Sequence, residues 1–252
     1  MAILQELSLY MPEPLTSLIK AKPRSYCFLI LIIFGIASCG GGGDNQDTGD
    51  PTRFEGEIEN FERRDKVSPP PAGGVVVIGS SSIRLWTGIY RDLQPITIVR
   101  RGFGGSTMYD ALYYLDRIVL PYAPRSVVIY EGDNDIAYGT TPELITEDFI
   151  NIVTELKAHN AEIRIYFISI KPSLSRWTLW DKMHKTNAMI KALADNDVSI
   201  VYIDVATEML NEKGEPNVDL FQADLLHLNA NGYALWKRIL QDTMVSFEQA
   251  FE

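Results

Sequence analysis

Short apolar segments that alternate with segments of helical periodicity constrain the fold of this chain more than any other feature of its sequence. The apolar run at residues 75–78 is bounded by glycines and is typical of a strand buried on both faces of a sheet. Further strands are expected at 96–99, 126–130, 163–168 and 199–205, and helices at 108–118, 142–158, about 182–194 and from Asn229 onward. Strands that alternate with helices imply right-handed crossovers and a parallel sheet. The sequence therefore predicts one three-layer α/β/α sandwich, with its chemistry at the carboxyl ends of the strands.

Local signals also mark the ends of two helices. Phe54, Ile58 and Phe61 recur at spacings of four and three, which predicts a short amphipathic helix ahead of the first strand. The three prolines at 69–71 end that helix, because proline cannot continue it. Thr141 followed by Pro142 suits a helix cap with proline in the first turn.

The composition narrows the classes of function. Of the 252 residues, 46% are hydrophobic and 22% are charged, which is typical of a globular protein. The formal net charge of −10 argues against a nucleic-acid partner, because phosphate binding requires a basic surface. Cys27 and Cys39 are too few for a cysteine zinc cluster, and the three histidines, His159, His184 and His227, stand far apart without an HExxH pair. No metal or other cofactor is therefore expected.

The N-terminal segment has the pattern of a targeting signal. Lys20, Lys22 and Arg24 precede an apolar run at 27–36, which is shorter than the roughly 20 residues that span a bilayer. A basic region, a short apolar region and small residues in this order are typical of a secretory signal peptide. The run ends in Ile-Ala-Ser-Cys at 36–39, which resembles the lipobox of bacterial lipoproteins. The alternative is an ordinary signal peptide with a chance cysteine near its end.

The lipobox resemblance implies that Cys39 carries lipid and becomes the first mature residue. Residues 1–38 would then be the signal peptide, 39–51 a flexible tether rich in glycine, and 52–252 the folded domain. The protein would be a lipid-anchored protein of the bacterial cell envelope, either periplasmic or at the cell surface. The sequence does not indicate an oligomeric state.

A serine at the end of the first expected strand is the first candidate for chemistry. Ser81 stands at a strand-to-helix turn, where the backbone N–H groups of a helix N-terminus favour developing negative charge. That position suits a nucleophile, although a serine that merely caps a helix has the same pattern. The G-x-S-x-G elbow of α/β-hydrolases is absent, because Ser82 and Ile83 follow Ser81. No GKS or GKT follows to complete a phosphate-binding loop.

Three later segments carry groups that suit acyl transfer. Gly104 and Gly105 follow the second strand, where a bare backbone N–H can face an oxyanion, and Asn134 follows the third with a side-chain amide. Asp224 stands three residues before His227, on a loop ahead of the last helix. A carboxylate there can hold the imidazole through Nδ1 and leave Nε2 free to accept a serine proton. Each segment alone is a weak signal, and their joint occurrence carries the prediction.

Taken in order, the four segments resemble the SGNH (GDSL-type) hydrolase family of esterases and acyltransferases, over roughly residues 52 to 245. The family's Gly-Asp-Ser block is matched at 79–81, with Ser80 in place of an aspartate that is not a triad member. Its Gly-x-Asn-Asp block is matched at 132–135, and its Asp-x-x-His block at 224–227. The resemblance implies a flavodoxin-like sheet of five parallel strands.

The same resemblance assigns roles in a two-step acyl transfer that needs no cofactor. Ser81 would attack an ester carbonyl, while His227 acts as general base and Asp224 orients it. The oxyanion would be held by the N–H groups of Ser81 and Gly105, with Gly104 as a near alternative to the latter, and by the Asn134 side chain. Water would then release the acid.

The substrate is the least defined part of the prediction. Arg84, Trp86 and Trp177 are candidates to line a cleft and stack on sugar rings, unless the tryptophans are core residues and the arginine is merely solvated. No long apolar lid is evident, which argues against a lipase. The leading hypothesis is a serine esterase that removes short acyl groups, above all acetyl, from a small molecule or polysaccharide. The alternatives are an acyltransferase acting on cell-envelope glycans, a lysophospholipase or lipid esterase, and a non-catalytic glycan-binding lipoprotein.

Overall fold

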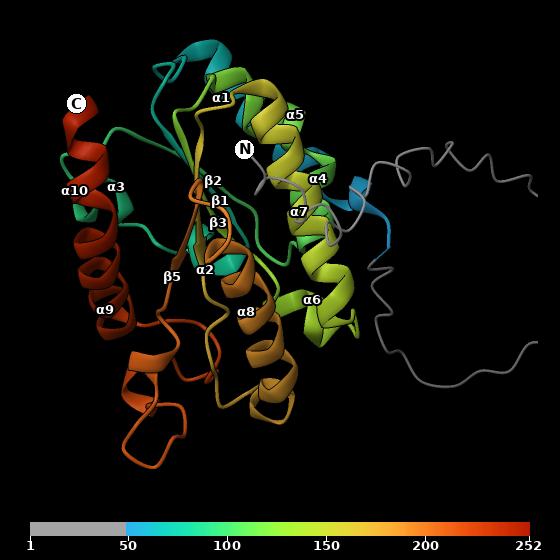
Figure 1. The fold of residues 1–252 in the computed structure, drawn as a ribbon, viewed down its shortest axis with the longest axis vertical. Coiled ribbons are helices and arrows are strands. Elements are labelled where there is room, and N and C mark those ends of the chain that lie inside the picture. Colours follow the sequence, from blue (N-terminus) through green and yellow to red (C-terminus); the bar gives the residue numbers. More distant parts are fainter. Residues whose placement is uncertain (1–48) are drawn as a thin grey trace, which may run out of the picture. The chain divides into compact units, whose positions relative to one another are not determined.

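A five-stranded sheet forms the centre of the computed structural model, which describes residues 49–252. The expected signal peptide, Cys39 and most of the tether lie outside the described residues. The strand order is β2-β1-β3-β4-β5, and all neighbouring strands are parallel (Figure 1). The strands are β1 (Val75–Gly79), β2 (Ile98–Gly102), β3 (Ser126–Tyr130), β4 (Arg164–Ile168) and β5 (Ile200–Ile203). The predicted parallel α/β fold is confirmed.

Helices follow the strands as the alternating pattern predicts. They are α1 (Glu55–Val67), α2 (Ser81–Arg84), α3 (Ile89–Asp92), α4 (Met108–Tyr113), α5 (Leu115–Ile118), α6 (Asp133–Ala137), α7 (Pro142–His159), α8 (Trp180–Ala194), α9 (Ala230–Leu240) and α10 (Ser246–Glu248). A short 3₁₀ turn at Pro51–Phe54 leads into α1, which buries Ile58 and Phe61 and ends ahead of the three prolines. Thr141 caps α7 by accepting the N–H of Leu144, with Pro142 in the first turn as expected.

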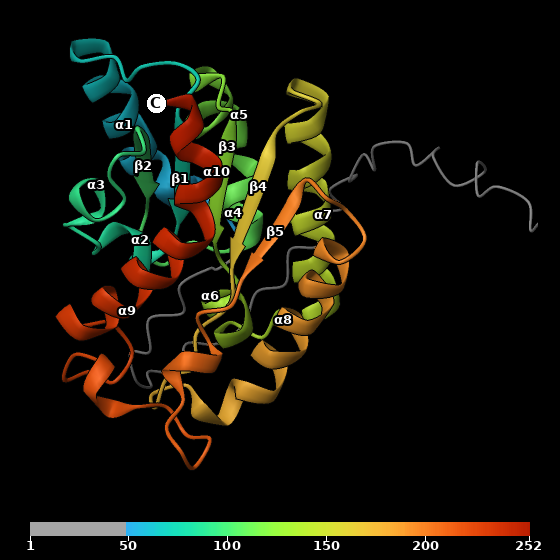
Figure 2. The same ribbon diagram turned by 60° about the vertical axis from the view of Figure 1, so that its left-hand side comes forward.

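Two layers of helices cover the sheet because its side chains alternate between the two faces. Val76 and Ile78 of β1 belong to one core with residues of α1, α4, α5, α7 and α8. Val75 and Val77 belong to the other core with residues of α2, α3 and α9. Figure 2 shows α7 and α8 on one side of the sheet and α9 and α10 on the other. All residues of β1 are buried, as a central parallel strand requires.

The structure differs from the sequence prediction at some element ends. Strand β2 begins at Ile98 rather than at 96, because Ile96 is buried in a turn where its N–H donates to the Leu93 carbonyl. The single helix expected at 108–118 is divided into α4 and α5 at Tyr114. The Tyr114 hydroxyl is buried and donates to the Pro51 carbonyl 2.9 Å away, which ties this break to the turn before α1.

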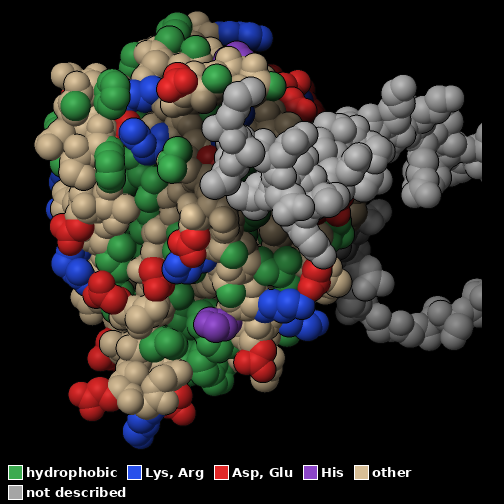
Figure 3. Space-filling model, in the orientation of Figure 1, with side chains coloured by type: hydrophobic (Ala, Val, Ile, Leu, Met, Phe, Trp, Pro, Cys, Tyr) green, Lys and Arg blue, Asp and Glu red, His purple; other side chains and the backbone are tan. Residues whose placement is uncertain are grey.

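The surface of the domain is mixed in character. Acidic and basic side chains are interspersed with hydrophobic ones on the face shown in Figure 3. Within residues 49–252, no helix combines the length and the apolar character that a membrane crossing requires. The same residues hold no group of three or more His, Cys, Asp or Glu side chains placed to bind a metal ion.

Candidate active site

The turn after β1 brings Ser81 to the carboxyl edge of the sheet. β1 ends at Gly79, where a Cβ would lie 2.6 Å from both Ile83 Cγ1 and the Tyr130 carbonyl oxygen, so only glycine fits. Ser80 is the residue before α2 and Ser81 is the first residue of that short helix. Ser80 and Ser82 are each only 2% exposed, whereas Ser81 is partly exposed. Of the three adjacent serines, Ser81 is therefore the one that a substrate can reach.

A chain of hydrogen bonds joins Ser81 to the C-terminal loop. His227 Nε2 lies 3.1 Å from Ser81 Oγ, and His227 Nδ1 lies 2.6 Å from Asp224 Oδ2. The other carboxylate oxygen, Asp224 Oδ1, accepts the backbone N–H groups of Leu226 and His227 at 3.0 and 2.9 Å. The structure thus brings together Ser81, Asp224 and His227, the three residues selected from the sequence, although Ser81 and His227 are 146 positions apart.

The environment of Asp224 keeps its carboxylate ionised. Desolvation raises the pKa of Asp224, but the hydrogen bonds from the His227 ring and from two backbone N–H groups outweigh it and lower the pKa to about 2. An ionised carboxylate holds the proton on Nδ1 of the imidazole, which leaves Nε2 as an acceptor facing the Ser81 hydroxyl. The arrangement can therefore move a proton from Ser81 to His227.

The loop that carries Asp224 and His227 is fixed by its own backbone bonds. Gln222 N–H donates to the His227 carbonyl at 2.8 Å, and Leu225 N–H donates to the Gln222 carbonyl at 2.9 Å. Leu225 has φ = 57°, a left-handed conformation that costs a non-glycine residue on the order of 1 kcal/mol. Its carbonyl accepts the N–H of Ser175 at 3.1 Å, so the loop after β4 helps to hold this turn in place.

The other candidate donors for an oxyanion follow β2 and β3, whose carboxyl ends lie at the same edge of the parallel sheet as the turn that carries Ser81. The backbone N–H groups of Ser81 and Gly105 have no hydrogen-bond acceptor among residues 49–252. Gly105 has φ = 92°, in the region that favours glycine, and it borders a cavity of about 370 Å³. Gly104, the alternative donor, lines the same cavity and lies against the Arg84 guanidinium. Asn134 is nearly buried in the first turn of α6, at the end of β3.

The Asn134 amide is oriented from both of its ends. Its Nδ2 donates to the Ser106 carbonyl at 2.9 Å, which leaves the second amide hydrogen for a substrate. Its Oδ1 accepts from both terminal nitrogens of Arg176 at 3.1 Å. Because Arg176 fixes the oxygen, the nitrogen must face the other way. Sequence reasoning did not predict that Arg176 orients Asn134, since nothing in the segment around Arg176 indicates a contact with a residue 42 positions earlier.

A buried ion cluster holds Arg176 in turn. Asp133 is 4% exposed, and its two oxygens pair with Lys171 Nζ and Arg176 Nη1, each at 2.5 Å. Burial raises the pKa of Asp133, but the two cations outweigh it and lower the pKa to about 2. Lys171 is only 1% exposed, so this ion pair is sealed from water. The cluster links the end of β3 to the loop after β4.

The predicted substrate-binding residues fall in different environments. Arg84 is exposed at the end of α2, next to Gly104. Trp177 is partly exposed and its ring stacks on Trp180 with centroids 5.8 Å apart. Trp86 is 1% exposed and its indole N–H donates to Asp92 at 2.9 Å, so the prediction that Trp86 stacks on substrate is wrong. Its large apolar ring is a core residue that packs on Trp236.

A serine, a histidine and an aspartate are hydrogen-bonded at the carboxyl edge of a parallel α/β/α sandwich, an arrangement that suits nucleophilic acyl transfer. Residues 78–235 match the GDSL-like Lipase/Acylhydrolase family, and the chain belongs to that family. Among curated proteins, none matches the sequence significantly.

Solved structures share this fold at low sequence identity. A protein from Streptococcus pneumonia, provisionally described as a platelet activating factor, is 20% identical with a TM-score of 0.67, covering 76% of this chain and 92% of that one. A GDSL-like lipase from Bacteroides thetaiotaomicron is 20% identical with a TM-score of 0.61, covering 79% and 99%. An acetyl xylan esterase is 20% identical with a TM-score of 0.56, covering 68% and 98%. These likenesses show the fold.

Proposed function

We propose that this protein is a serine esterase that removes short acyl groups, above all acetyl, from carbohydrate. The observation that carries the proposal is the hydrogen-bonded chain from Ser81 Oγ through His227 to the ionised Asp224. The cavity beside Gly105 and the fold shared with an acetyl xylan esterase support a sugar ester as substrate. We treat hydrolysis rather than transfer as the primary reaction, because water needs no acceptor site.

The proposed reaction has two steps. Ser81 Oγ attacks the carbonyl carbon as His227 Nε2 takes its proton, and the oxyanion accepts hydrogen bonds from the N–H groups of Ser81 and Gly105 and from Asn134 Nδ2. Collapse breaks the bond to the sugar oxygen, which leaves with the proton from His227. A water molecule then attacks the acyl-serine while His227 takes its proton. The bond between the acyl carbon and Ser81 Oγ breaks, the acid leaves, and His227 returns the proton to Ser81. Each oxyanion donor is expected to lower the barrier by about 3 kcal/mol.

A series of p-nitrophenyl esters from acetate to octanoate tests the acyl preference. A groove that buried the chain would add about 0.8 kcal/mol for each CH₂, so kcat/KM would rise steeply with length. The proposal expects acetate to be the best substrate, with activity falling by butyrate. A steady rise in kcat/KM from acetate to octanoate would replace the carbohydrate-esterase proposal with a lipid esterase.

A related proposal concerns location. We propose that Cys39, which lies outside the described residues, carries a lipid that anchors the enzyme in the bacterial cell envelope. Cys39→Ser should abolish incorporation of radiolabelled palmitate in cells, while Cys27→Ser, within the apolar run, serves as the matched control and keeps it. Equal labelling of the wild type and Cys39→Ser would contradict the anchor.

A further inference from the structure

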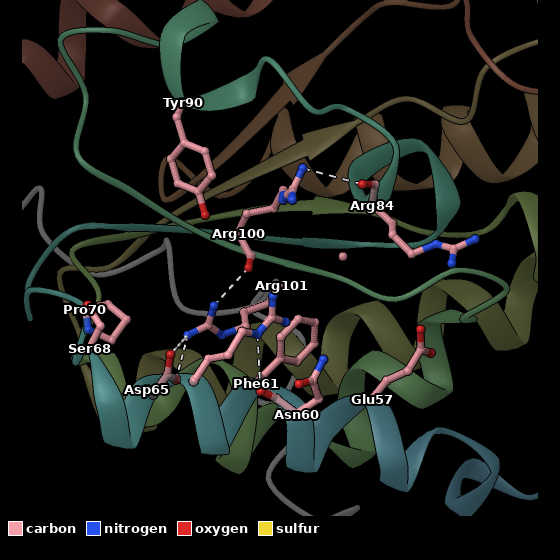
Figure 4. A pocket seen from close by; sticks show the side chains of 12 residues that line it. Glu57, Asn60, Phe61, Asp65, Ser68, Pro70, Arg84, Tyr90, Arg100 and Arg101 are labelled. Atoms are coloured by element: carbon pink, nitrogen blue, oxygen red, sulfur yellow. Dashed lines mark hydrogen bonds and ion pairs between the residues drawn. The ribbon is translucent and has the colours of Figure 1, made fainter.

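A second cavity, of about 400 Å³, lies between α1 and the end of β2, and its walls are rich in arginine (Figure 4). Four arginines line it together with two carboxylates, Glu57 and Asp65. One of the four, Arg101, is 6% exposed and is neutralised by Asp65 at 2.6 Å. The remaining lining charges are three arginines and one carboxylate, that of Glu57. These arginines are Arg64, Arg84 and Arg100.

These three guanidinium groups have no ion-pair partner among residues 49–252. Arg100 donates to the Trp86 carbonyl at 2.9 Å, and Arg64 donates to the Asn60 carbonyl at 3.2 Å, so neutral acceptors hold both. Arg84 is exposed at the end of α2. In a chain with a formal net charge of −10, three arginines without a carboxylate partner around one cavity form a local site for an anion.

The arginine cavity adjoins the candidate active site. Arg84 follows Ser81 by three residues, about one turn of the same helix. Its guanidinium lies so close to Gly104 that a Cβ there would be 2.5 Å from Arg84 Nε. Glu57 lines both this cavity and the cavity that borders Gly105. The two cavities adjoin at Glu57, so a substrate whose ester sits at Gly105 can extend past Glu57 into the arginine cavity.

From this arrangement we infer that the enzyme acts on an acidic glycan, and that Arg64, Arg84 and Arg100 bind an anionic group, a carboxylate or a phosphate, on a sugar near the esterified one. This substrate class rests on the proposed esterase function. The exposed ring of Tyr90, which also lines the cavity and lies 5.8 Å from the Arg100 guanidinium carbon, offers a face on which a sugar can stack. Figure 4 shows Tyr90 and Arg100 on one side of the cavity, across from α1.

The test compares an acidic oligosaccharide with a neutral one of the same length. Calorimetry on the full chain measures binding of oligogalacturonate and of its carboxyl-reduced counterpart, and acetate release from the O-acetylated forms gives kcat/KM. We expect a preference for the acidic form of about ten-fold, because each exposed ion pair contributes a factor of up to about five. The preference should shrink as NaCl rises to several hundred mM, since salt screens exposed charges.

Variants of Arg64 on α1 and Arg84 on α2, with Arg63 of α1 as the matched control, locate the effect. Arg64→Gln should reduce the preference two- to five-fold and Arg64→Gln with Arg84→Gln should abolish it, within the range for exposed ion pairs. Arg63→Gln removes the same charge from the exposed surface of α1 outside the cavity and should leave the preference unchanged. A preference that survives the double substitution would overturn the inference.

The outcomes separate this inference from the proposed function. If the protein hydrolyses p-nitrophenyl acetate but binds the acidic and the neutral oligosaccharide equally, with equal kcat/KM for both, the acidic-glycan inference is overturned and the proposed esterase function stands. Arginine-dependent binding of oligogalacturonate by a protein that hydrolyses no ester refutes the esterase and keeps the anion site. A preference for lysophosphatidylglycerol over lysophosphatidylcholine, without any preference between the glycans, would assign the arginines to a lipid headgroup and overturn the inference. Inhibition by inorganic phosphate without either preference would show only a free-anion site and would overturn it too.

Discussion

The contact between Arg176 and Asn134 makes a sharp test of how Asn134, the proposed oxyanion donor, is held. Arg176→Lys keeps a positive charge for Asp133 but loses the planar fork that donates twice to Asn134 Oδ1. Without these bonds the Asn134 amide is held only by the Ser106 carbonyl, and its nitrogen no longer has one fixed direction. We expect kcat to fall and KM to change little, because the oxyanion forms only after the substrate has bound.

The size of the effect follows from what each group contributes. Removing an oxyanion donor outright costs about 3 kcal/mol, or 10²–10³ in kcat, and Asn134→Ala should lose that much. Arg176→Lys leaves the donor present but less ordered, so we expect a part of that loss, about 1.4 kcal/mol or ten-fold in kcat. In an Asn134→Ala background Arg176 has no amide to orient, and the same substitution should change kcat less than about two-fold.

Kinetics on p-nitrophenyl acetate for the four proteins of this cycle measure the coupling directly. Thermal unfolding of the same variants measures a loss of stability separately from a loss of activity. Arg176→Met leaves the buried Asp133 paired with Lys171 alone, so this variant should unfold at a lower temperature than Arg176→Lys. If Arg176→Lys reduces kcat equally in the wild type and in Asn134→Ala, the two residues act independently and the positioning argument is refuted.

Three further predictions follow from the site and the core. Ser81→Ala should abolish turnover and labelling by a fluorophosphonate, whereas Ser80→Ala and Ser82→Ala should keep both; a labelled peptide that maps to Ser80 or Ser82 would overturn the assignment. Asp224→Asn should lower kcat by about 10³–10⁴, because a neutral amide no longer holds the required imidazole tautomer, and a loss below ten-fold would show that another group orients the ring. Burial raises the pKa of Asp148 to about 6, above its unfolded value near 3.8, so the native state is penalised progressively as pH rises from about 4 to 6. Asp148→Asn should therefore stabilise the protein by about 3 kcal/mol at pH 8 and by little at pH 4, as urea unfolding can measure. An equal change at both pH values would contradict this reasoning.

The sheet could be predicted because its signals are local. Each strand is a short apolar run between turn residues, and the helical segment between successive runs favours parallel strands. Element ends were less predictable, as β2 shows. Ile96 is as apolar as the strand residues, but it is buried by a turn rather than by pairing in the sheet. A periodicity argument detects burial and does not distinguish these two ways of achieving it.

Side-chain environments were harder to predict than elements. Trp86 and Trp177 have the same chemistry in the sequence, yet the fold places the first in the core against α9 and leaves the second partly exposed on the loop before α8. The segment around Arg176 has no periodic or turn signal that points to Asn134. Its contact exists only because the loops after β3 and β4 meet at one edge of the sheet, which depends on strand order.

The Gly-Asp-Asn-Asp segment shows why a short motif can specify so much of a site. Gly132 has φ = 107° and a Cβ there would lie 2.4 Å from Ile170 Cδ1, so the turn requires glycine. Asp133 is ionised and holds Arg176, which in turn orients Asn134.

The pKa of Asp135, two residues after Asp133, is shifted in the opposite direction. Asp135 accepts the N–H groups of Gly132 and Met108, and burial without a cation raises its pKa to about 7. Its bond to Met108 ties the start of α4 to α6, and therefore ties the loop that carries Gly105 to the one that carries Asn134. The two aspartates of this segment thus have different roles. The charge of Asp133 holds Arg176, which orients Asn134. The carboxyl oxygens of Asp135 accept backbone N–H groups from the loops after β2 and β3 and so connect them. The spacing of the proposed oxyanion donors, Gly105 and Asn134, therefore depends on both aspartates.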